Sequence, residues 1–215
     1  MTRVQARHII RSASAVQLPS LRPANIGDVE SFMRLKTALS AEAEHMIFDV
    51  ANRAAFLHRT SEELTGASTG TRGIFVLEWE GALVGYIDVH SAIGDTDSDF
   101  ASFSLALLKD WWGCGLGSRL VLVGEEWARI QRFRFLVILV AVLNERAFSL
   151  YRKLGYTVCA DLRAAEAVEN GVGDHLTLGR MIISNQNARP LPGDDRRSHP
   201  TKSELPEWRY RASAC

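Results

Sequence analysis

The sequence predicts a single α/β domain in which helices flank a sheet. Strand-like and helix-like segments alternate between residues 16 and 183. Two β-rich runs flank Glu80 and Gly81, an arrangement typical of a hairpin. Farther along, a strand-like run leads through the glycine-rich stretch DWWGCGLGSRL, residues 110–120, into a helix-like segment. This alternation indicates helices packed on a sheet.

The first half of the domain is expected to contain a short strand, two helices and the hairpin. A helix is expected from Asp28, because the apolar residues after it keep approximate helical spacing. Thr60 and Glu63 resemble a capping box, which would begin a second, short helix. The runs on either side of the turn predict strands at Ile74–Trp79 and Ala82–Val89.

The second half alternates strands and helices around the glycine-rich stretch. A strand is expected at Ala101–Leu108, and a buried one at Leu136–Val142, which is apolar throughout. A helix opens at Asn144 and ends at Gly155, a residue suited to a C-terminal cap. The helix after the glycines has an apolar stripe formed by Leu116, Leu120, Val123, Trp127 and Ile130. The two closing strands are expected at Tyr156–Leu162 and His175–Ile183.

The two ends of the chain differ from its middle. Residues 1–15 carry arginines and serines but no acidic residue, which favours a disordered extension, with an organelle transit peptide as the alternative. Residues 184–215 contain four prolines and mixed charges and predict a disordered polar tail. The ordered domain is therefore expected at residues 16–183.

Composition excludes several classes of function. The 25 basic side chains balance 25 acidic ones, so no net field attracts nucleic acid or a membrane surface. The 3 cysteines lack CxxC spacing and the 6 histidines are scattered, which favours neither a disulfide framework nor a metal site. The longest apolar run, Phe135–Leu143, is too short to span a membrane. We expect a cytoplasmic protein without a metal.

The glycine-rich stretch predicts a binding site for phosphate. A turn between a strand and a helix directs several backbone N–H groups, and the positive end of the helix, at one point. Gly113, Gly115 and Gly117 allow a ligand to approach that backbone closely. A Walker loop would need Lys and Ser or Thr after Gly117, where Ser118 and Arg119 stand. A dinucleotide fingerprint would need a third glycine at Ser118 and an acid on the next strand, which has none. Neither pattern therefore fits.

Two segments resemble motifs of the GNAT N-acetyltransferase superfamily. LLKDWWGCGLGSRLVLVGEEWAR resembles its acetyl-coenzyme A loop, a strand followed by Gln/Arg-x-x-Gly-x-Gly/Ala and a helix. Gly115 and Gly117 take the glycine positions, whereas Trp112 stands where the family usually has a cationic or amide side chain. VAVLNERAFSLYRKLGY resembles the block that follows, with matches at Asn144, Ala147, Leu150, Tyr151, Lys153, Gly155 and Tyr156. The resemblance runs from Ser20 to Met181.

The resemblance implies a mixed, mainly antiparallel sheet with a splay between two adjacent parallel strands. It also implies that acetyl-CoA binds as a co-substrate, with pantetheine in the splay and the pyrophosphate on the glycine loop. An N–H near Leu107 would polarise the thioester carbonyl. The implied cofactor-binding residues are Leu107, Leu108, Trp112, Gly113, Cys114, Gly115, Leu116, Gly117, Ser118, Asn144, Ala147, Tyr151 and Lys153.

The implied reaction is direct transfer of an acetyl group to a primary amine in a ternary complex. The amine has to lose a proton before it attacks, and the leaving thiolate has to gain one. Tyr151 is the candidate general acid because it lies on the inward stripe of its helix; a core tyrosine is the alternative. Asp88 is the candidate general base, since Ala101–Leu108 offers only serines, and Glu42 and Glu44 are further candidates.

Several of these residues also have structural explanations. Asn144 could be simply an N-cap, a role compatible with cofactor contact, and Lys153 could be a solvated lysine. Asp88 could lie on the solvent face, and Trp111 is expected to pack at the edge of the loop. Cys114 is not expected to act as a nucleophile, because no histidine lies near it in the sequence.

The sequence leaves alternatives to acetyl transfer open. A non-catalytic acyl-CoA-binding module would suit Trp112 and the missing glutamate on the strand before the loop. A nucleotide-binding protein is a third interpretation. The acceptor could be a small amine or a peptide or protein amine, and a homodimer is compatible with the resemblance.

Overall fold

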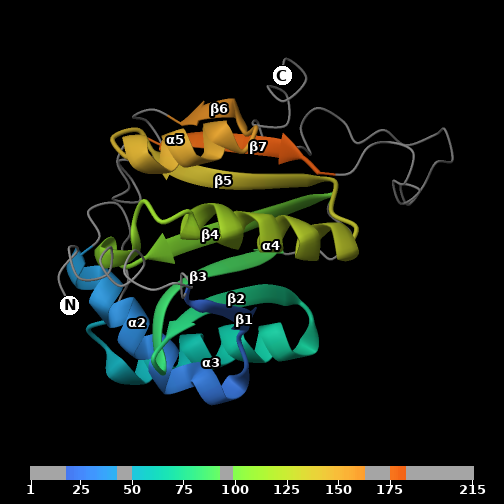
Figure 1. Cartoon of the computed structure of the whole chain (residues 1–215). Helices are drawn as coiled ribbons and strands as arrows, with labels where there is room; N and C mark the ends of the chain where they lie inside the picture. The colour runs from blue at the N-terminus through green and yellow to red at the C-terminus, as the bar shows by residue number, and fades with distance from the viewer. Residues whose placement is uncertain (1–17, 43–49, 93–98, 163–174, 183–215) are drawn as a thin grey trace, which may run out of the picture.

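The structure is a computed structural model and describes residues 18–42, 50–92, 99–162 and 175–182. Glu44, the N-terminal extension and the C-terminal tail considered above lie outside these residues. Within them, seven strands form one sheet in the order β1-β2-β3-β4-β5-β7-β6, and helices cover both of its faces (Figure 1). None of the helices in this part of the chain has the length and apolar content needed to cross a membrane.

The elements follow the predicted alternation closely. In chain order they are β1 (Ser20–Pro23), η1 (Ile26–Asp28), α2 (Val29–Glu42), α3 (Arg53–Thr69), β2 (Arg72–Trp79), β3 (Ala82–Ser91), β4 (Phe100–Leu107), η2 (Lys109–Trp111), α4 (Leu116–Ile130), β5 (Phe135–Ala141), α5 (Glu145–Lys153), β6 (Thr157–Leu162) and β7 (His175–Met181). The predicted hairpin is present, with Glu80 and Gly81 both at positive φ, 49° and 78°.

The sheet has one parallel contact, and that contact is short. Strands β4 and β5 pair from Phe100↔Phe135 to Ser102↔Val137 only, although β4 continues to Leu107 and β5 to Ala141. Every other neighbouring pair of strands is antiparallel. The two strands therefore diverge, as the ribbon shows (Figure 1). The expected mixed, mainly antiparallel sheet with a splay is confirmed.

Two apolar layers hold the helices to the sheet. Helix α4 covers one face, where Gly124 lies so close to β3 that an added Cβ would be 2.7 Å from the Cδ1 atom of Ile87. Helices α2 and α3 cover the other face, where Phe32 and Leu64 are fully buried against Tyr86. Glycine at position 124 thus sets how closely α4 approaches the sheet.

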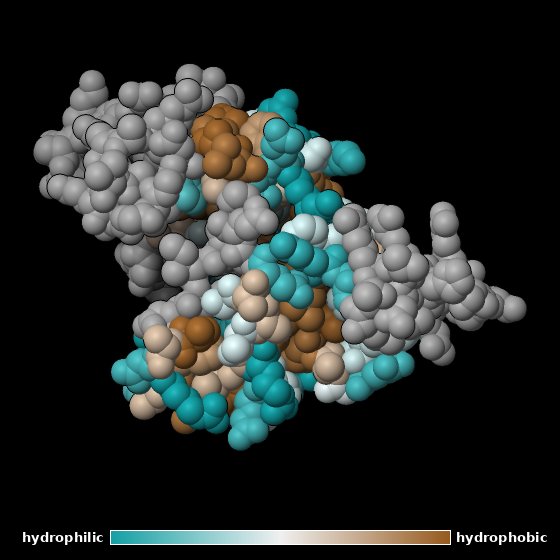
Figure 2. Space-filling view, turned by 90° about the vertical axis from the view of Figure 1, so that its left-hand side faces the viewer, coloured by the Kyte–Doolittle hydropathy of each residue, from teal (hydrophilic) through white to brown (hydrophobic). Residues whose placement is uncertain are grey.

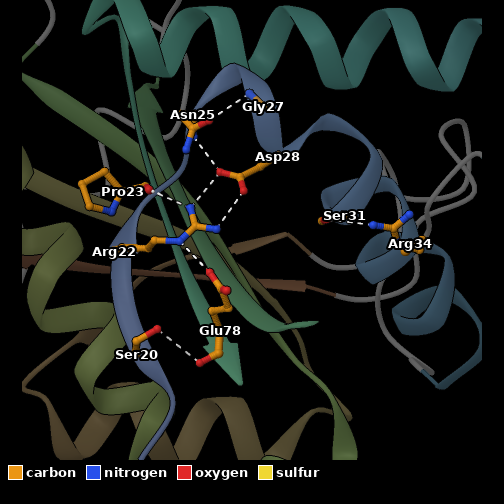
Figure 3. A network of polar contacts seen from close by, with 9 residues as sticks. All are labelled: Ser20, Arg22, Pro23, Asn25, Gly27, Asp28, Ser31, Arg34 and Glu78. Atoms are coloured by element: carbon orange, nitrogen blue, oxygen red, sulfur yellow. Dashed lines mark hydrogen bonds and ion pairs between the residues drawn. The ribbon is translucent and has the colours of Figure 1, made fainter. Parts of the chain in front are cut away.

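Arg22 fastens the start of α2 to the edge of the sheet (Figure 3). Its two terminal nitrogens donate to Asp28 at 2.8 Å each, and its Nε donates to Glu78 of β2 at 2.7 Å. The hydrogen bond from Arg22 lowers the pKa of Asp28, which also accepts the backbone N–H of Asn25. This network joins the turn before α2 to β1 and β2, and the far end of α2 reaches the site described below.

Helix α3 differs from the prediction. It begins at Arg53, after Asn52, whose side chain accepts the N–H of Ala55 at 3.1 Å. Thr60 is buried in the middle of this helix and does not begin one, and Glu63 forms an ion pair with Lys36 of α2. The Thr-x-x-Glu pattern was misleading because the helix had already begun upstream.

Candidate functional site

The backbone of β4 turns alternately toward β3 and toward the gap. Leu108 donates its N–H to Val84 at 3.0 Å, and Ala92 donates to Phe100 at 2.9 Å. In an antiparallel ladder these bonded residues alternate with residues that face the other way. Leu105 and Leu107 therefore direct their backbone groups toward β5, where the pairing has already ended.

Trp112 changes which of these groups remain for a ligand. Its indole N–H donates to the carbonyl oxygen of Leu107 at 2.6 Å. The groups left facing the gap are the N–H and C=O of Leu105 and the N–H of Leu107. Leu108 was expected to bind pantetheine through its backbone, but its N–H bonds to Val84 of β3. The backbone groups open to an extended ligand are therefore those of Leu105 and Leu107.

The gap opens into a cleft of about 900 Å³. Its walls come from the end of α2, the end of β4, the glycine loop and α5. Of the expected cofactor-binding residues, those that line it are Leu107, Trp112, Gly113, Gly115, Gly117, Ser118, Asn144, Ala147, Tyr151 and Lys153. Figure 2 looks onto the end of the molecule at which the strands diverge and shows apolar and hydrophilic side chains next to each other there.

Three of the expected cofactor-binding residues do not line the cleft: Leu108, Cys114 and Leu116. The N–H of Leu108 bonds to β3. Leu116 is fully buried in the core, since it begins the inward face of α4. The Cys114 Sγ lies 3.8 Å from the carbonyl oxygen of Trp112. For Leu116 and Cys114, a contribution to ligand binding would have to come from the backbone.

The glycine loop leaves the first amides of α4 without acceptors inside the helix. Gly113 and Gly115 have φ values of 78° and 77°, which only glycine adopts at little cost. Gly115 is the N-cap of α4 and offers no side chain to cap the helix. The N–H groups of Leu116, Gly117 and Ser118 have no intrahelical acceptor, so they form a site suited to an anion.

Helix α5 closes the other side of this loop. Its N-cap Asn144 accepts the N–H of Ala147 at 3.1 Å, so the capping role considered for Asn144 is confirmed. At Gly117, an added Cβ would lie 3.1 Å from a methyl group of Leu150. The small residue therefore allows the start of α4 to lie against α5.

Tyr151 is buried in the wall of the cleft. Its ring meets Phe103 edge-on at 5.6 Å and lies 5.8 Å from the ring of Tyr156. Burial raises the pKa of the Tyr151 phenol well above its usual range, so the group is protonated at neutral pH. A protonated phenol beside the cleft can donate a proton and is unsuited to accept one.

Comparison with known proteins places this arrangement in a family. A model of the acetyltransferase (GNAT) family matches residues 38–156, more than half of the 215 residues. The chain belongs to the GNAT acetyltransferase family. The resemblance noted in the sequence is thereby confirmed. A search of curated protein sequences gives no significant match.

Solved GNAT structures share the fold at low sequence identity. The acetyltransferase of this family from Streptococcus pneumoniae has a TM-score of 0.64 and 20% identity, over 76% of this chain and 99% of that one. The phosphinothricin acetyltransferase from Sinorhizobium meliloti, in complex with AcCoA, gives 0.66 and 18%, over 82% and 95%. The ribosomal-protein-alanine N-acetyltransferase from Brucella melitensis gives 0.63 and 18%, over 75% and 99%. At such identities the likeness establishes the fold alone.

Asp88 of this GNAT protein is held in an ion pair away from the lining of the cleft. It accepts from the Nε and a terminal nitrogen of Arg72 at 3.1 and 2.5 Å, and the Nδ1 of His90 lies 3.7 Å away. Burial would raise the pKa of Asp88, but its contacts with His90 and Arg72 outweigh burial and lower that pKa. Asp88 faces the α2/α3 layer, as Tyr86 does, and is buried rather than solvated.

Glu42 reaches the cleft from the end of α2. Its Oε2 accepts the N–H of Lys109 at 2.8 Å, directly after β4. Among the described residues that line the cleft, the carboxylates are Glu42 and Glu145. The contact with Lys109 joins residues far apart in the sequence, so no local pattern could reveal it.

The sequence analysis did not single out the buried carboxylate of α4. Glu125 is fully buried and accepts hydrogen bonds from Tyr156 at 3.2 Å, Arg180 at 2.8 Å and Arg129 at 3.0 Å. The predicted stripe placed Ile130 inward, yet Ile130 is 67% exposed. The residues that are buried on α4 are Leu116, Leu120, Val121, Gly124, Glu125 and Ala128.

Proposed function

We propose that this protein transfers an acetyl group from acetyl-CoA to a primary amine, by direct attack in a ternary complex. The observation that carries the proposal is the divergence of β4 and β5 after Ser102 and Val137. The resulting gap leads into a cleft that is lined both by the glycine loop and by Tyr151. This arrangement suits a long ligand with a diphosphate at one end and a reactive group at the other.

The residues present suit acetyl-CoA, whose thioester supplies the activated acetyl group. The amides of Gly113 to Ser118 would receive the diphosphate at the start of α4. Leu105 and Leu107 would pair with the amides of the pantetheine arm, as a neighbouring strand does. Lys153 lines the same cleft and would face the outer phosphates.

Tyr151 would act as the general acid. Burial raises the pKa of its phenol, so the group is protonated at neutral pH but is a weaker acid than a solvated tyrosine. The hydroxyl could then donate its proton to the leaving thiolate. Phe103 and Tyr156 pack against the ring and limit its rotation.

Glu42 would accept the proton of the amine or bind the ammonium group. Its carboxylate lines the cleft and accepts the N–H of Lys109, which directly follows β4. Asp88 stays a candidate for the base, although its lowered pKa makes it a weak one and its carboxylate is engaged by Arg72. Either residue would act on an acceptor that enters from the side of α2.

The proposal is tested in two steps. Calorimetric titration with acetyl-CoA measures binding, and thiol release is then followed with small amines, peptide N-termini and lysine peptides. We expect binding in the micromolar range, typical of a co-substrate, and thiol release with at least one class of amine. Tyr151→Phe should bind acetyl-CoA like the wild type and lose about a hundredfold in turnover. An unchanged rate in this variant across pH would contradict the role of Tyr151.

A non-catalytic acyl-CoA-binding module is the alternative function. It is favoured by one observation, the absence of any carboxylate from β4, Phe100–Leu107. Binding of acetyl-CoA without thiol release on any amine of the panel would support this alternative. Failure to bind acetyl-CoA at all would contradict both functions.

A further inference from the structure

The indole of Trp112, which lines the cleft, makes one hydrogen bond and two contacts with cations. Its indole N–H bonds to the carbonyl oxygen of Leu107 at 2.6 Å, which anchors one edge of the ring. The guanidinium of Arg146 lies 4.6 Å from the ring centroid, and the Nζ of Lys109 lies 5.9 Å from it. Cations at these distances are attracted by the ring face. The indole therefore serves as a fixed platform for positive charge.

The contact between Trp112 and Arg146 joins the two sides of the gap. Trp112 belongs to the loop after β4, and Arg146 belongs to the first turn of α5, which follows β5. Both residues line the cleft. The guanidinium is thus held where the two strands are diverging, next to the glycine loop.

Arg146 stands at an electrostatically unfavourable place for a cation. The first turn of a helix carries partial positive charge, which favours anions and disfavours arginine. Within the described part of the chain, no carboxylate forms an ion pair with Arg146, and its contact is with the indole face. Arg146 is also exposed, so burial does not explain it. An anion brought by a ligand would satisfy the guanidinium.

We propose that Trp112 holds Arg146 as the cation that receives the diphosphate of the acyl-CoA co-substrate. This inference rests on the proposed function. The acetyl-coenzyme A loop of the family usually has a cationic or amide side chain at the position of Trp112. In this protein Arg146 of α5 would supply the cation instead. Trp112 is then a positioning residue, and Arg146 is a binding residue that completes the anion site formed by the amides of the loop.

The test measures binding of CoA and of dephospho-CoA, which lacks the 3′-phosphate but keeps the diphosphate. Arg146→Gln should weaken binding of both ligands about tenfold or more, and by the same factor, because one charge-assisted contact to the diphosphate is lost. Arg152→Gln is the matched control. It removes the same charge from the same helix, but Arg152 is exposed and does not line the cleft, so binding should change less than twofold.

Two variants of Trp112 distinguish the contribution of its ring face from that of its indole N–H bond to Leu107. Trp112→Phe keeps a ring face and loses the N–H, and it should weaken CoA binding less than Trp112→Leu. Trp112→Leu should weaken it several-fold, and the double variant with Arg146→Gln should lose little more than Arg146→Gln alone. Circular dichroism and thermal melting of each variant establish that the fold is retained.

The outcomes distinguish this inference from the function on which it rests. Wild-type protein that binds no CoA contradicts the proposed function. Wild-type protein that binds CoA, with Arg146→Gln equal to it, contradicts only the inference. A loss seen with CoA and absent with dephospho-CoA would assign Arg146 to the 3′-phosphate and would also overturn the inference. Additive losses in the double variant would overturn the role of Trp112.

Discussion

At the scale of single residues, Gly115 combines a backbone requirement with a binding role. Its φ of 77° is unfavourable for any residue with a Cβ, although no atom lies within 4 Å of an added Cβ. Gly115→Ala should therefore lower the free energy of unfolding by about 1–2 kcal/mol through strain alone. It should also weaken CoA binding, because the loop amides shift. Chemical denaturation and calorimetry measure the two effects.

Gly70→Ala provides the matched control for this prediction. Gly70 caps the end of α3 with a φ of 81°, and an added Cβ again meets nothing within 4 Å. The strain should be similar, but Gly70 does not line the cleft, so CoA binding should be retained. Equal loss of binding in both variants would show that the effect at Gly115 is a general loss of stability.

Asp88 gives a prediction about pH. The pKa of Asp88 is lowered in the folded protein, so its ion pair stabilises the fold above the unfolded pKa of about 4, and this stability is lost as pH falls through the folded pKa. Asp88→Asn should lower the free energy of unfolding by about 2–3 kcal/mol at pH 7. The loss should be smaller than for a fully buried ion pair, because the Arg72 side chain is 29% exposed. The cost should shrink below about pH 4.

The exposed ion pair of Arg34 and Glu30 is the control for Asp88. Both side chains are more than two-thirds exposed, at 71% and 80%. Glu30→Gln should change the free energy of unfolding by less than about 0.5 kcal/mol at any pH. Urea denaturation at a series of pH values measures both variants, and a pH-independent cost of Asp88→Asn would contradict the linkage.

At the scale of the elements, the buried carboxylate of α4 ties that helix to the far part of the sheet. Tyr156 follows α5, and Arg180 belongs to β7, and both donate to Glu125. Tyr156→Phe keeps the ring that packs on Tyr151 and removes one donor from a buried carboxylate. We expect a loss of about 1–3 kcal/mol in the free energy of unfolding.

The same variant tests whether this network acts on stability rather than on binding. Because the Tyr156 ring remains, CoA binding by Tyr156→Phe should stay within about threefold of the wild type, measured below the melting temperature of the variant. A large loss of binding with unchanged stability would contradict this structural role.

Elements fixed by local chemistry were predictable from the sequence. Asn144 as N-cap, Gly155 at the helix end and the turn at Glu80 and Gly81 each depend on neighbours within a few residues, and the structure has all three. The start of α3 was not predictable in the same way. Its cap, Asn52, stands before a weakly amphipathic segment, and the local Thr60 pattern was the stronger signal.

Contacts between residues distant in the sequence could not be predicted, although Glu42 itself was named as a candidate for the base. Glu125 has the appearance of a surface residue in the sequence, and its burial depends on Arg180, 55 positions away. The bond between Glu42 and Lys109 spans 67 positions. The glycine motif therefore identified the loop that lines the cleft, while the contacts of these two carboxylates required the fold.

At the scale of the whole molecule, the sheet divides into two parts that meet only at the start of β4 and β5. The part β1-β2-β3-β4 is covered by α2 and α3 on one face, and β5-β7-β6 carries α5 (Figure 1). The order of strands places the free edge of β4 in the middle of the sheet, where it faces the cleft. An edge of this kind can accept an extended ligand as an additional strand.

Hydrogen exchange along β4 tests this architecture directly. Ser104 and Ala106 lie in the positions that bond to β3, so their amides should exchange slowly in the free protein. Leu105 and Leu107 face the gap, and their amides should exchange at least about tenfold faster. Addition of CoA should slow Leu105, Leu107 or both, and leave Ser104 and Ala106 unchanged. Equal protection of all four amides before CoA is added would mean that β4 and β5 close on each other in solution, and a ligand could then enter only by separating strands that are already paired.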